Sequence, residues 1–496
     1  MRRNGLRPGA RFLVGAIAAA PLALALAGSA HGSPGTWERA WGGDVDSGGG
    51  TGFEICAVAA SCKAGINTGL GGEMNGPTGV AVDSAGSVYV ADYLQQRIQK
   101  FDAAGNFLRT WGKDVIAGGP TGFEVCTVAA DCKAGAEGGL GGEFSNPYGV
   151  AVDANDDVYV ADSSNNRIQV FDAQGSFKRT WGKDVDSAVG SGWELCQTAA
   201  NCQQGLPGGL GGEMEFPSGV DFDSNFVYVA ENGNMRVQVF DRQGTFQRLW
   251  GHDAVSGGGT DYEVCTVANQ CQVVLPPYGF KGGEFYGPND LAVGGGRVYV
   301  TDSANQRIQV FDTLGNFQQA WGQNVITGGF TGYEICTVAA DCTFADNGGI
   351  GGAMGEPDGI VRSASGEVYL VDNGNERIQV FDSLGNFRRT WGRDVILGDP
   401  TGFEICTSAP TCQSGFDGSL GGEFSEPAGL ALTPSGALYV GDADNNRVQK
   451  FAADPVTPPA GTPPGQPVSA PKKKCKKKRR KPGAAAKKCK KKKKQR

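Results

Sequence analysis

The 496-residue chain contains 80 glycines, and 20% of its residues are charged, so it does not have the composition of a disordered polyampholyte. Its net charge of −7 hides an asymmetry: residues 35–454 carry a net charge of −28, whereas residues 472–496 hold 17 Lys and Arg and no acid. An acidic body of this kind argues against nucleic-acid binding by the body, because it repels phosphates.

The N-terminal 30 residues have the pattern of a secretory signal peptide. Arginines come first, with a weak twin-arginine signal at Arg2 and Arg3, followed by an apolar stretch from Phe12 to Ala27. The stretch is short for a membrane span, and no other segment is apolar enough to be one. We therefore expect a secreted or cell-surface protein without a transmembrane span. In an oxidising compartment, its 14 cysteines are expected to form disulfides.

One unit of about 70 residues recurs six times, and this repeat is the strongest signal in the chain. Each unit has a marker proline and a Trp-Gly pair. The prolines are Pro77, Pro147, Pro217, Pro288, Pro357 and Pro427, and the pairs begin at Trp41, Trp111, Trp181, Trp250, Trp321 and Trp391.

Residues 147–182 illustrate the unit. Four short runs rich in β-branched and aromatic residues, Gly149–Asp153, Val158–Asp162, Arg167–Phe171 and Phe177–Trp181, are separated by small turn residues. The second run is apolar on both faces, as expected of a strand between two neighbouring sheets. Four such strands in meander order make one blade of an all-β propeller, so six units predict six blades.

The two ends of the array fit together. The sixth unit stops after its third strand, at Phe451, while Trp37–Gly42 aligns without a gap with the fourth strand of the next unit, Phe107–Gly112. We expect the N-terminal strand to complete the last blade, because sharing a blade removes the exposed edges of an open array.

The pattern PxGVAVDxxGxVYVADxxNNRIQVFDxxGxF resembles the NHL repeat, and the resemblance covers residues 35–454. It implies a six-bladed propeller that binds proteins, peptides or RNA, or serves as an extracellular sensor domain. The Asn-x-Arg element matches at Asn165/Arg167, Asn234/Arg236, Asn305/Arg307, Asn375/Arg377 and Asn445/Arg447; the first unit departs from it, with Gln95 before Arg97.

Each unit is longer than ordinary blade repeats of about 40–50 residues, so each carries an insertion between its Trp-Gly pair and the next marker proline. We expect the insertions to form a crown on one face and to carry the function.

Every insertion holds one Cys-x5-Cys pair. The pairs are Cys56 and Cys62, Cys126 and Cys132, Cys196 and Cys202, Cys265 and Cys271, Cys336 and Cys342, and Cys406 and Cys412. Disulfide pairing within each loop is the simplest connectivity, and pairing between neighbouring loops is the alternative. Zinc is disfavoured by the spacing and by the lack of partner histidines.

Acidic residues also recur in the insertions, as Asp114, Glu124 and Glu143 do in the insertion between Trp111 and Pro147. Oxygen-rich loops suit Ca²⁺, and calcium is the only cofactor that the sequence suggests. The alternative is that these carboxylates cap turns or face water.

A carboxylate and an arginine five residues later recur in every unit, at the junction of the second and third strands. Six near-copies point to architecture, because active sites are normally unique, and we predict bidentate Arg–carboxylate clamps that fix the blade geometry. The pairs are Asp92/Arg97, Asp162/Arg167, Glu231/Arg236, Asp302/Arg307, Asp372/Arg377 and Asp442/Arg447.

The chain offers little material for catalysis. Its two histidines are His31, beside the signal region, and His252, which we expect in an exposed loop, so Ser-His-Asp chemistry lacks a base. A lactonase-like, calcium-dependent hydrolase remains the alternative, with Asp83, Asp153 and Asp223 as candidate channel ligands. The competing interpretation is that these aspartates accept turn hydrogen bonds.

Residues 455–471 are predicted to be a Pro-rich linker and residues 472–496 a disordered Lys-rich tail. The tail either binds an anionic envelope polymer, lipid or nucleic acid, or folds back on the acidic body. The sequence thus favours a secreted or surface-held binding or scaffold module, with a protein, peptide or glycan ligand on its insertions, over an enzyme.

Overall fold

The computed structural model describes residues 35–259, 261–273, 279–329 and 331–453. The chain divides into two units, Met1–Asp454 and Pro455–Arg496, of which only the first contains described residues. The predicted signal peptide (1–30), linker (455–471) and tail (472–496) lie outside the described residues and stay predictions. None of the helices in the described segments has the length and apolarity needed to cross a membrane.

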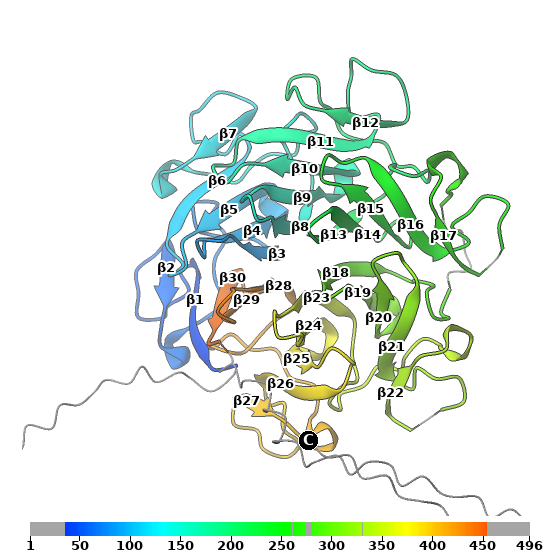
Figure 1. The fold of residues 1–496 in the computed structure, drawn as a ribbon. Helices are drawn as coiled ribbons and strands as arrows, with labels where there is room; N and C mark the ends of the chain where they lie inside the picture. Colours follow the sequence, from blue (N-terminus) through cyan, green and yellow to red (C-terminus); the bar gives the residue numbers. More distant parts are fainter. Residues whose placement is uncertain (1–34, 260, 274–278, 330, 454–496) are drawn as a thin grey trace, which may run out of the picture. The chain divides into compact units, whose positions relative to one another are not determined.

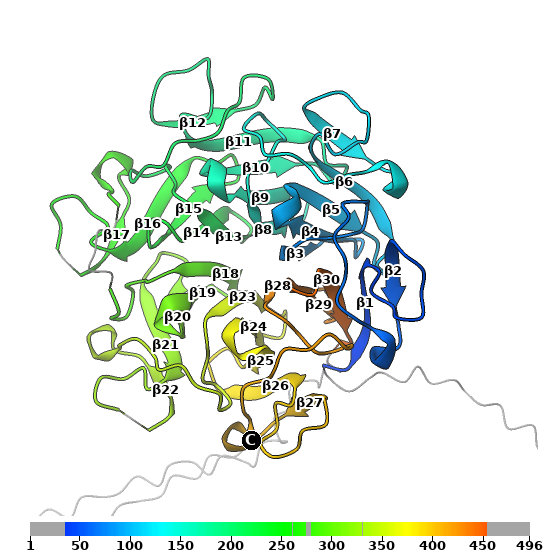
Figure 2. The same ribbon diagram turned by 180° about the vertical axis from the view of Figure 1, so that it is seen from behind.

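Six antiparallel sheets of five strands each are arranged radially around a common centre (Figures 1 and 2). The predicted six-bladed all-β propeller is thereby confirmed. We number the blades from the first complete one and name their strands a to e from the centre outward. Blades one to five are formed by β3–β7, β8–β12, β13–β17, β18–β22 and β23–β27, and blade six by β28, β29, β30, β1 and β2.

The strand bounds repeat closely from blade to blade. Strands a are β3 (Pro77–Val82), β8 (Pro147–Val152), β13 (Pro217–Phe222), β18 (Pro288–Gly294), β23 (Pro357–Arg362) and β28 (Pro427–Leu432). Strands b are β4 (Val88–Asp92), β9 (Val158–Asp162), β14 (Phe226–Glu231), β19 (Arg297–Asp302), β24 (Val368–Asp372) and β29 (Leu438–Asp442). Strands c are β5 (Arg97–Phe101), β10 (Arg167–Phe171), β15 (Arg236–Asp241), β20 (Arg307–Asp312), β25 (Arg377–Phe381) and β30 (Arg447–Phe451).

The outer strands come from the Trp-Gly segments and the insertions. Strands d are β6 (Phe107–Lys113), β11 (Phe177–Lys183), β16 (Phe246–His252), β21 (Phe317–Gln323), β26 (Phe387–Arg393) and β1 (Trp37–Gly43). Strands e are β7 (Phe123–Cys126), β12 (Trp193–Cys196), β17 (Tyr262–Cys265), β22 (Tyr333–Cys336), β27 (Phe403–Cys406) and β2 (Phe53–Cys56).

Short 3₁₀ turns complete the blades. Four follow strand b: η2 (Tyr93–Gln95), η4 (Ser163–Asn165), η6 (Ser303–Asn305) and η8 (Asn373–Asn375). Five lie in insertions, between the paired cysteines: η1 (Ala59–Ser61), η3 (Ala129–Asp131), η5 (Ala268–Gln270), η7 (Ala339–Asp341) and η9 (Ala409–Thr411).

The fifth strand corrects the expectation of four strands per blade. The first half of each insertion pairs with strand d, as where Trp181 lies opposite Leu195. This strand is only four residues long, too short for its pattern to be recognised in the sequence. The expectation of a crown on one face is also corrected in part, because the insertions build the outer rim (Figure 1) before crossing one face to the next strand a.

The N-terminus closes the ring as predicted. β1 pairs with β30, with Trp41 opposite Val448, and β2 pairs with β1 on the outside. The first and last described segments of the chain therefore share one sheet, and blade six has both of its outer strands from the N-terminal end.

Aromatic residues pack each blade against the next. Trp111 of blade one is fully buried, and its ring centroid lies 5.9 Å from that of Phe171 in blade two. Gly175, in the turn between β10 and β11, has a φ of +83°, and a Cβ there would come within 2.8 Å of the Trp111 ring. The glycine is therefore needed both for its backbone conformation and for close approach. Equivalent Trp–Phe contacts of 5.6–6.0 Å join the other blades.

The two ends of the propeller differ in what covers them. Since strands a to e alternate in direction, the a–b and c–d turns lie on one face, which we call the turn face. The b–c turns, the d–e loops and the segments that lead into strand a lie on the other, which we call the insertion face. Backbone hydrogen bonds there join the b–c turn to the incoming segment, as from Leu94 N to Asn75 O at 3.1 Å.

Candidate functional site

Each blade contains one fully buried arginine whose five N–H groups are all hydrogen-bonded. In blade two, Arg167 Nε donates to Asp162 Oδ2 at 2.8 Å, and neither side chain has any exposed surface. Its Nη2 donates to the backbone oxygens of Leu140 and Glu143. Its Nη1 donates to those of Gly139 and Gln203.

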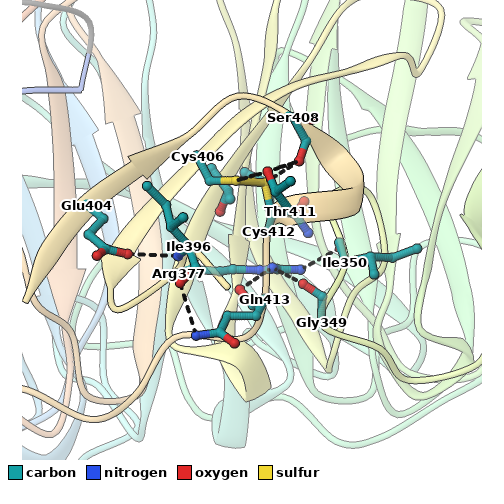
Figure 3. The surroundings of a disulfide bond; sticks show 12 residues. Gly349, Ile350, Arg377, Ile396, Glu404, Cys406, Ser408, Thr411, Cys412 and Gln413 are labelled. Atoms are coloured by element: carbon teal, nitrogen blue, oxygen red, sulfur yellow. Dashed lines mark hydrogen bonds between the residues drawn. A yellow bond between two sulfur atoms is a disulfide. The ribbon is translucent and has the colours of Figure 1, made fainter. Parts of the chain in front are cut away.

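These contacts show what the ion pair holds. Residues 139–143 belong to the insertion that leads into blade two, and Gln203 belongs to the insertion that leaves it. The arginine therefore joins two successive insertions to the same blade. Figure 3 shows the same arrangement in blade five, where Arg377 donates to the carbonyls of Ile350, before the blade, and Gln413, after it.

The same ion pair occurs in all six blades at 2.7–3.0 Å. The expected bidentate contact is wrong, because only Nε donates to the carboxylate while both Nη atoms donate to backbone carbonyls. The neighbouring motif residues complete the network. Gln169 Nε2 donates to Glu143 O and Asp162, and Asn165 Nδ2 donates to Asp162 and Gly138 O. The exception is Gln95 of blade one, whose buried amide has no hydrogen-bond partner in the part of the chain that the structure describes.

The twelve insertion cysteines form six disulfides, each within its own loop and each closing a separation of six residues. The connectivity is therefore the simpler of the two that the sequence left open, and pairing between neighbouring loops does not occur among these cysteines. The bonds are Cys56–Cys62, Cys126–Cys132, Cys196–Cys202, Cys265–Cys271, Cys336–Cys342 and Cys406–Cys412.

The disulfides are buried beside the arginine clamps. None of the twelve cysteines is more than 3% exposed. In Figure 3 the Cys406–Cys412 bond lies above the Arg377 clamp, on the same insertion that supplies Gln413. The disulfide and the clamp therefore fix the same loop from two sides.

The residues considered for calcium are engaged separately by the backbone. Asp114 accepts from Gly122 N, Glu124 from Ile116 N and Glu143 from Leu140 N, at 2.7–3.1 Å. In the described segments, no group of three His, Cys, Asp or Glu residues is placed to hold a metal. The structure therefore does not bring these three carboxylates together as a calcium site, and each of them stabilises its loop instead.

The aspartates considered for a lactonase-like channel site are also turn residues. Asp83 accepts from Ala85 N and Ser87 N, and Asp153 and Asp223 accept equivalent bonds. They lie at the turn-face ends of strands a, each directly after a residue that lines the central cavity (Val82, Val152 and Phe222), and are not themselves among the lining residues. His252 ends strand β16, in the outer part of blade three rather than in a loop, and is not near them.

The centre of the propeller contains a cavity of about 180 Å³ lined by strands a of all six blades. Three side chains from different blades meet in it. Tyr148 Oη donates to Asp358 Oδ2 at 3.1 Å, and Asn289 Nδ2 donates to Tyr148 Oη at 3.2 Å and also to Asp358. Asp221 and Asp290 complete the polar lining, and Asp358 is only 9% exposed.

Two of these carboxylates are held by neighbouring blades. Asp221 Oδ2 accepts from Val293 N at 2.7 Å, and Asp290 Oδ2 accepts from Ile360 N at 3.0 Å. Burial raises the pKa of Asp221 and of Asp358 to about 7 and that of Asp290 to about 6. Burial and the charge of Asp358 raise the pKa of Tyr148 well above its ordinary value.

Sequence reasoning missed this cluster, although the signal was present. The position after each marker proline varies, as Thr78, Tyr148, Ser218, Asn289, Asp358 and Ala428. The next position is glycine in five units and Asp290 in one. Two positions further along, again only one unit has an acidic residue: the six residues are Ala81, Ala151, Asp221, Ala292, Val361 and Ala431. The repeats thus depart from one another where they face the cavity.

The insertion face also exposes large apolar side chains. Phe280 and Phe344, from successive insertions, are 49% and 52% exposed, and their ring centroids lie 6.1 Å apart in an edge-to-face contact. Leu206, Phe216 and Phe416 are about as exposed, at 48–57%. Exposed aromatic side chains held on a rigid scaffold are typical of interaction surfaces.

Comparisons with known proteins agree with this architecture. The NHL repeat model matches residues 74–101, 144–171, 215–240, 285–311 and 424–451, which lie in five of the six blades. Each match runs from the end of an insertion to the end of strand c. The protein is therefore a six-bladed β-propeller built from NHL repeats. It belongs to the NHL-repeat family.

Among curated proteins, the chain is 26% identical over 313 residues to Protein SUPPRESSOR OF QUENCHING 1, chloroplastic, of Arabidopsis thaliana, covering 62% of this chain and 25% of that protein. It is 50% identical over 52 residues to Protein brain tumor of Drosophila melanogaster, covering 10% of this chain and 5% of that protein. The chain thus spans a quarter or less of the length of these relatives.

Solved structures show only a distant likeness. Virginiamycin B lyase from Staphylococcus aureus is 11% identical, with a TM-score of 0.38, over 77% of this chain and 97% of that one. A chain of the nidogen/laminin complex is 11% identical, with a TM-score of 0.35, over 76% of this chain and 95% of that one.

Proposed function

We propose that this protein is a binding module that recognises a protein or peptide partner on its insertion face. The exposed Phe280–Phe344 pair carries the proposal, because two aromatic rings in contact, each about half exposed, form a ready anchor for a partner's apolar side chain. The Arg clamps and disulfides favour binding, since a face that is already rigid loses little conformational entropy when a partner docks.

The site of action is proposed to be outside the cytoplasm, either free or at the cell surface. Six disulfides in one domain support this location, because such bonds persist in oxidising compartments. The N-terminal signal pattern supports it independently.

The hydrolase alternative has lost its supporting residues. The three aspartates that suggested it are used by turns, and the described residues hold no cluster suited to a metal. We therefore retain the binding module as the single proposed function.

A peptide-library selection tests the proposal without requiring that the partner be identified first. Peptides enriched on the immobilised full-length protein are titrated by calorimetry into the wild type, into Phe280→Ala/Phe344→Ala and into a matched control, Leu314→Ala/Leu384→Ala. The control leucines are 61% and 53% exposed on turn-face loops. We expect an apolar consensus whose affinity falls about tenfold or more in the phenylalanine variant only. Absence of a consensus, or equal losses in both variants, would contradict the proposal.

A further inference from the structure

The central cavity is a second site, on a different part of the molecule from the aromatic pair. Its volume of about 180 Å³ far exceeds the roughly 10–15 Å³ that one water occupies, but it is smaller than the 300–1,000 Å³ typical of pockets for drug-sized ligands. The cavity therefore accepts a group the size of one side chain.

The repeated architecture supplies an internal control for what the fold needs here. Five blades have glycine where blade four has Asp290, and the position of Asp221 is alanine or valine in the other five. Blade six has Ala428 where blade five has Asp358. The blade fold therefore does not require a carboxylate at any of these three positions.

The three cavity carboxylates lower the stability of the protein when nothing is bound in the cavity. Among the described residues, Asp221, Asp290 and Asp358 form no ion pair. The charge of Arg242 acts on Asp221, but Arg242 is paired with Asp153 at 3.2 Å. Asp358 is buried, and Asp221 and Asp290 are partly buried. A carboxylate withdrawn from water without a positive partner is unfavourable, so these residues oppose folding unless something neutralises them.

The side chains around them are arranged as more than a cluster of acids. Tyr148 and Asn289 reach Asp358 from blades two and four and fix its position across the cavity. The backbone N–H groups of Val293 and Ile360 fix Asp221 and Asp290. The result is a cavity in which these hydrogen-bond acceptors are oriented before a ligand arrives.

We infer that this cavity binds an organic cation with N–H donors, namely the ammonium or guanidinium group of a small amine or of a peptide side chain. Such a group supplies the positive charge that the carboxylates lack and donates hydrogen bonds to them. A bare divalent cation is the poorer ligand, because Ca²⁺ requires six to eight oxygens and the described carboxylates do not converge on one point.

Calorimetry on the full-length protein at pH 8 tests the inference. The probes are N-acetyl-lysine methylamide, agmatine, the tripeptide acetyl-Gly-Lys-Gly-amide and the neutral isostere N-acetyl-norleucine methylamide. We expect saturable binding of the cations and binding of the isostere at least about tenfold weaker, because a hydrogen bond to a charged group is the stronger kind. A tripeptide that binds more tightly than the small amines indicates a protein side chain as the natural ligand, and equal affinities indicate a small amine.

Two variants with the same net charge distinguish binding in the cavity from nonspecific attraction of cations to the acidic protein. Asp221→Asn/Asp358→Asn is expected to abolish binding of the cations. Asp157→Asn/Asp382→Asn, whose carboxylates accept hydrogen bonds on the turn face, is expected to leave it unchanged. The inference is overturned by no binding, by equal binding of the isostere, by equal loss in both variants, or by Ca²⁺ binding that depends on Asp221 and Asp358. The Phe280→Ala/Phe344→Ala variant should bind the amines normally, so failure here is distinct from failure of the proposed function.

Discussion

At the scale of single residues, comparison of equivalent positions in the six blades shows which residues are structural. The carboxylate, Asn, Arg and Gln of the NHL motif are buried in almost every copy, and their hydrogen bonds hold the Gly-rich incoming segment. Their roles are architectural because they recur. The residues that differ from blade to blade, such as Tyr148 and Asp358, are the ones that give the molecule a unique centre.

The one defective copy of the motif yields a stability prediction. Gln95 places a buried amide without a partner among the described residues where Asn165 donates two hydrogen bonds in blade two. Gln95→Asn should restore these bonds and raise the free energy of unfolding by about 1 kcal/mol, measured by chemical denaturation. The reverse change in blade two, Asn165→Gln, is the control and should lower it. A loss of stability in Gln95→Asn would show that blade one has its own packing.

The cavity carboxylates predict a dependence of stability on pH. Their pKa values of about 6 to 7 lie above the ordinary value of about 3.9, so the folded state binds protons more tightly than the unfolded state. The protonated carboxylates therefore contribute fully to the free energy of unfolding below about pH 4, and this contribution is lost as the pH rises through 6 to 7.

The comparison that isolates this effect is between the wild type and Asp221→Asn/Asp290→Asn/Asp358→Asn. From pH 4.5 to pH 8, the wild type should lose unfolding free energy relative to the variant, at up to about 1.4 kcal/mol per pH unit for each carboxylate that stays protonated in the folded state. Taking this difference cancels the titration of carboxylates elsewhere. Parallel pH profiles for the two proteins would show that these groups are not perturbed in solution.

At the scale of elements, each insertion is a rim strand, a disulfide loop and an incoming segment, joined to the blade by one arginine. Successive insertions also contact each other directly, as where Gly141 N donates to Ala199 O at 3.0 Å. The six insertions thus form a continuous outer layer around the six blades. The sequence predicted the disulfides but not the fifth strand, because four residues are too few to show a period.

The clamp of blade six has an additional role that can be measured. Arg447 Nη1 donates to Lys63 O, so it joins the last strand to the N-terminal insertion, whereas Arg167 joins segments that are closer along the chain. Arg447→Met and Arg167→Met should each lower stability by about 3–5 kcal/mol, because each leaves a buried carboxylate unpaired.

The two variants should differ in where the structure opens. Limited proteolysis is expected to release the N-terminal segment 35–66 first in Arg447→Met, because strand pairing and this clamp both hold β1 and β2 in blade six. Arg167→Met serves as the matched control and should be cut in the insertions around blade two. Identical digestion patterns would mean that the closure does not depend on Arg447.

At the scale of the whole molecule, periodicity made most of the fold predictable. Repeated prolines and Trp-Gly pairs fixed the number of blades, and the missing fourth strand of the last unit predicted the closure by Trp37–Gly42. The cavity could not be predicted in the same way. Its residues are about 70 or more positions apart and come together only when the ring closes. They also differ from one repeat to the next, so periodicity does not reveal them.

The same periodicity explains why the recurring acids suggested calcium. Carboxylates that recur from unit to unit resemble a set of equivalent metal sites. Those of the insertion between Trp111 and Pro147, however, each accept a hydrogen bond from a nearby backbone N–H, as Glu124 does from Ile116. In this protein, the residues that recur from blade to blade stabilise the scaffold. Both proposed binding sites lie where the symmetry is broken, in the central cavity and at the aromatic pair of two insertions.

Hydrogen–deuterium exchange of the full-length protein, with and without a peptide from the library selection, tests the binding-module proposal most directly. The proposal predicts slower exchange in residues 279–287 and 342–356, which carry the aromatic pair on the insertion face, and unchanged exchange in the turn-face loops at 102–106 and 172–176. Protection confined to the turn face, or a peptide that binds without protecting the insertions, would contradict it.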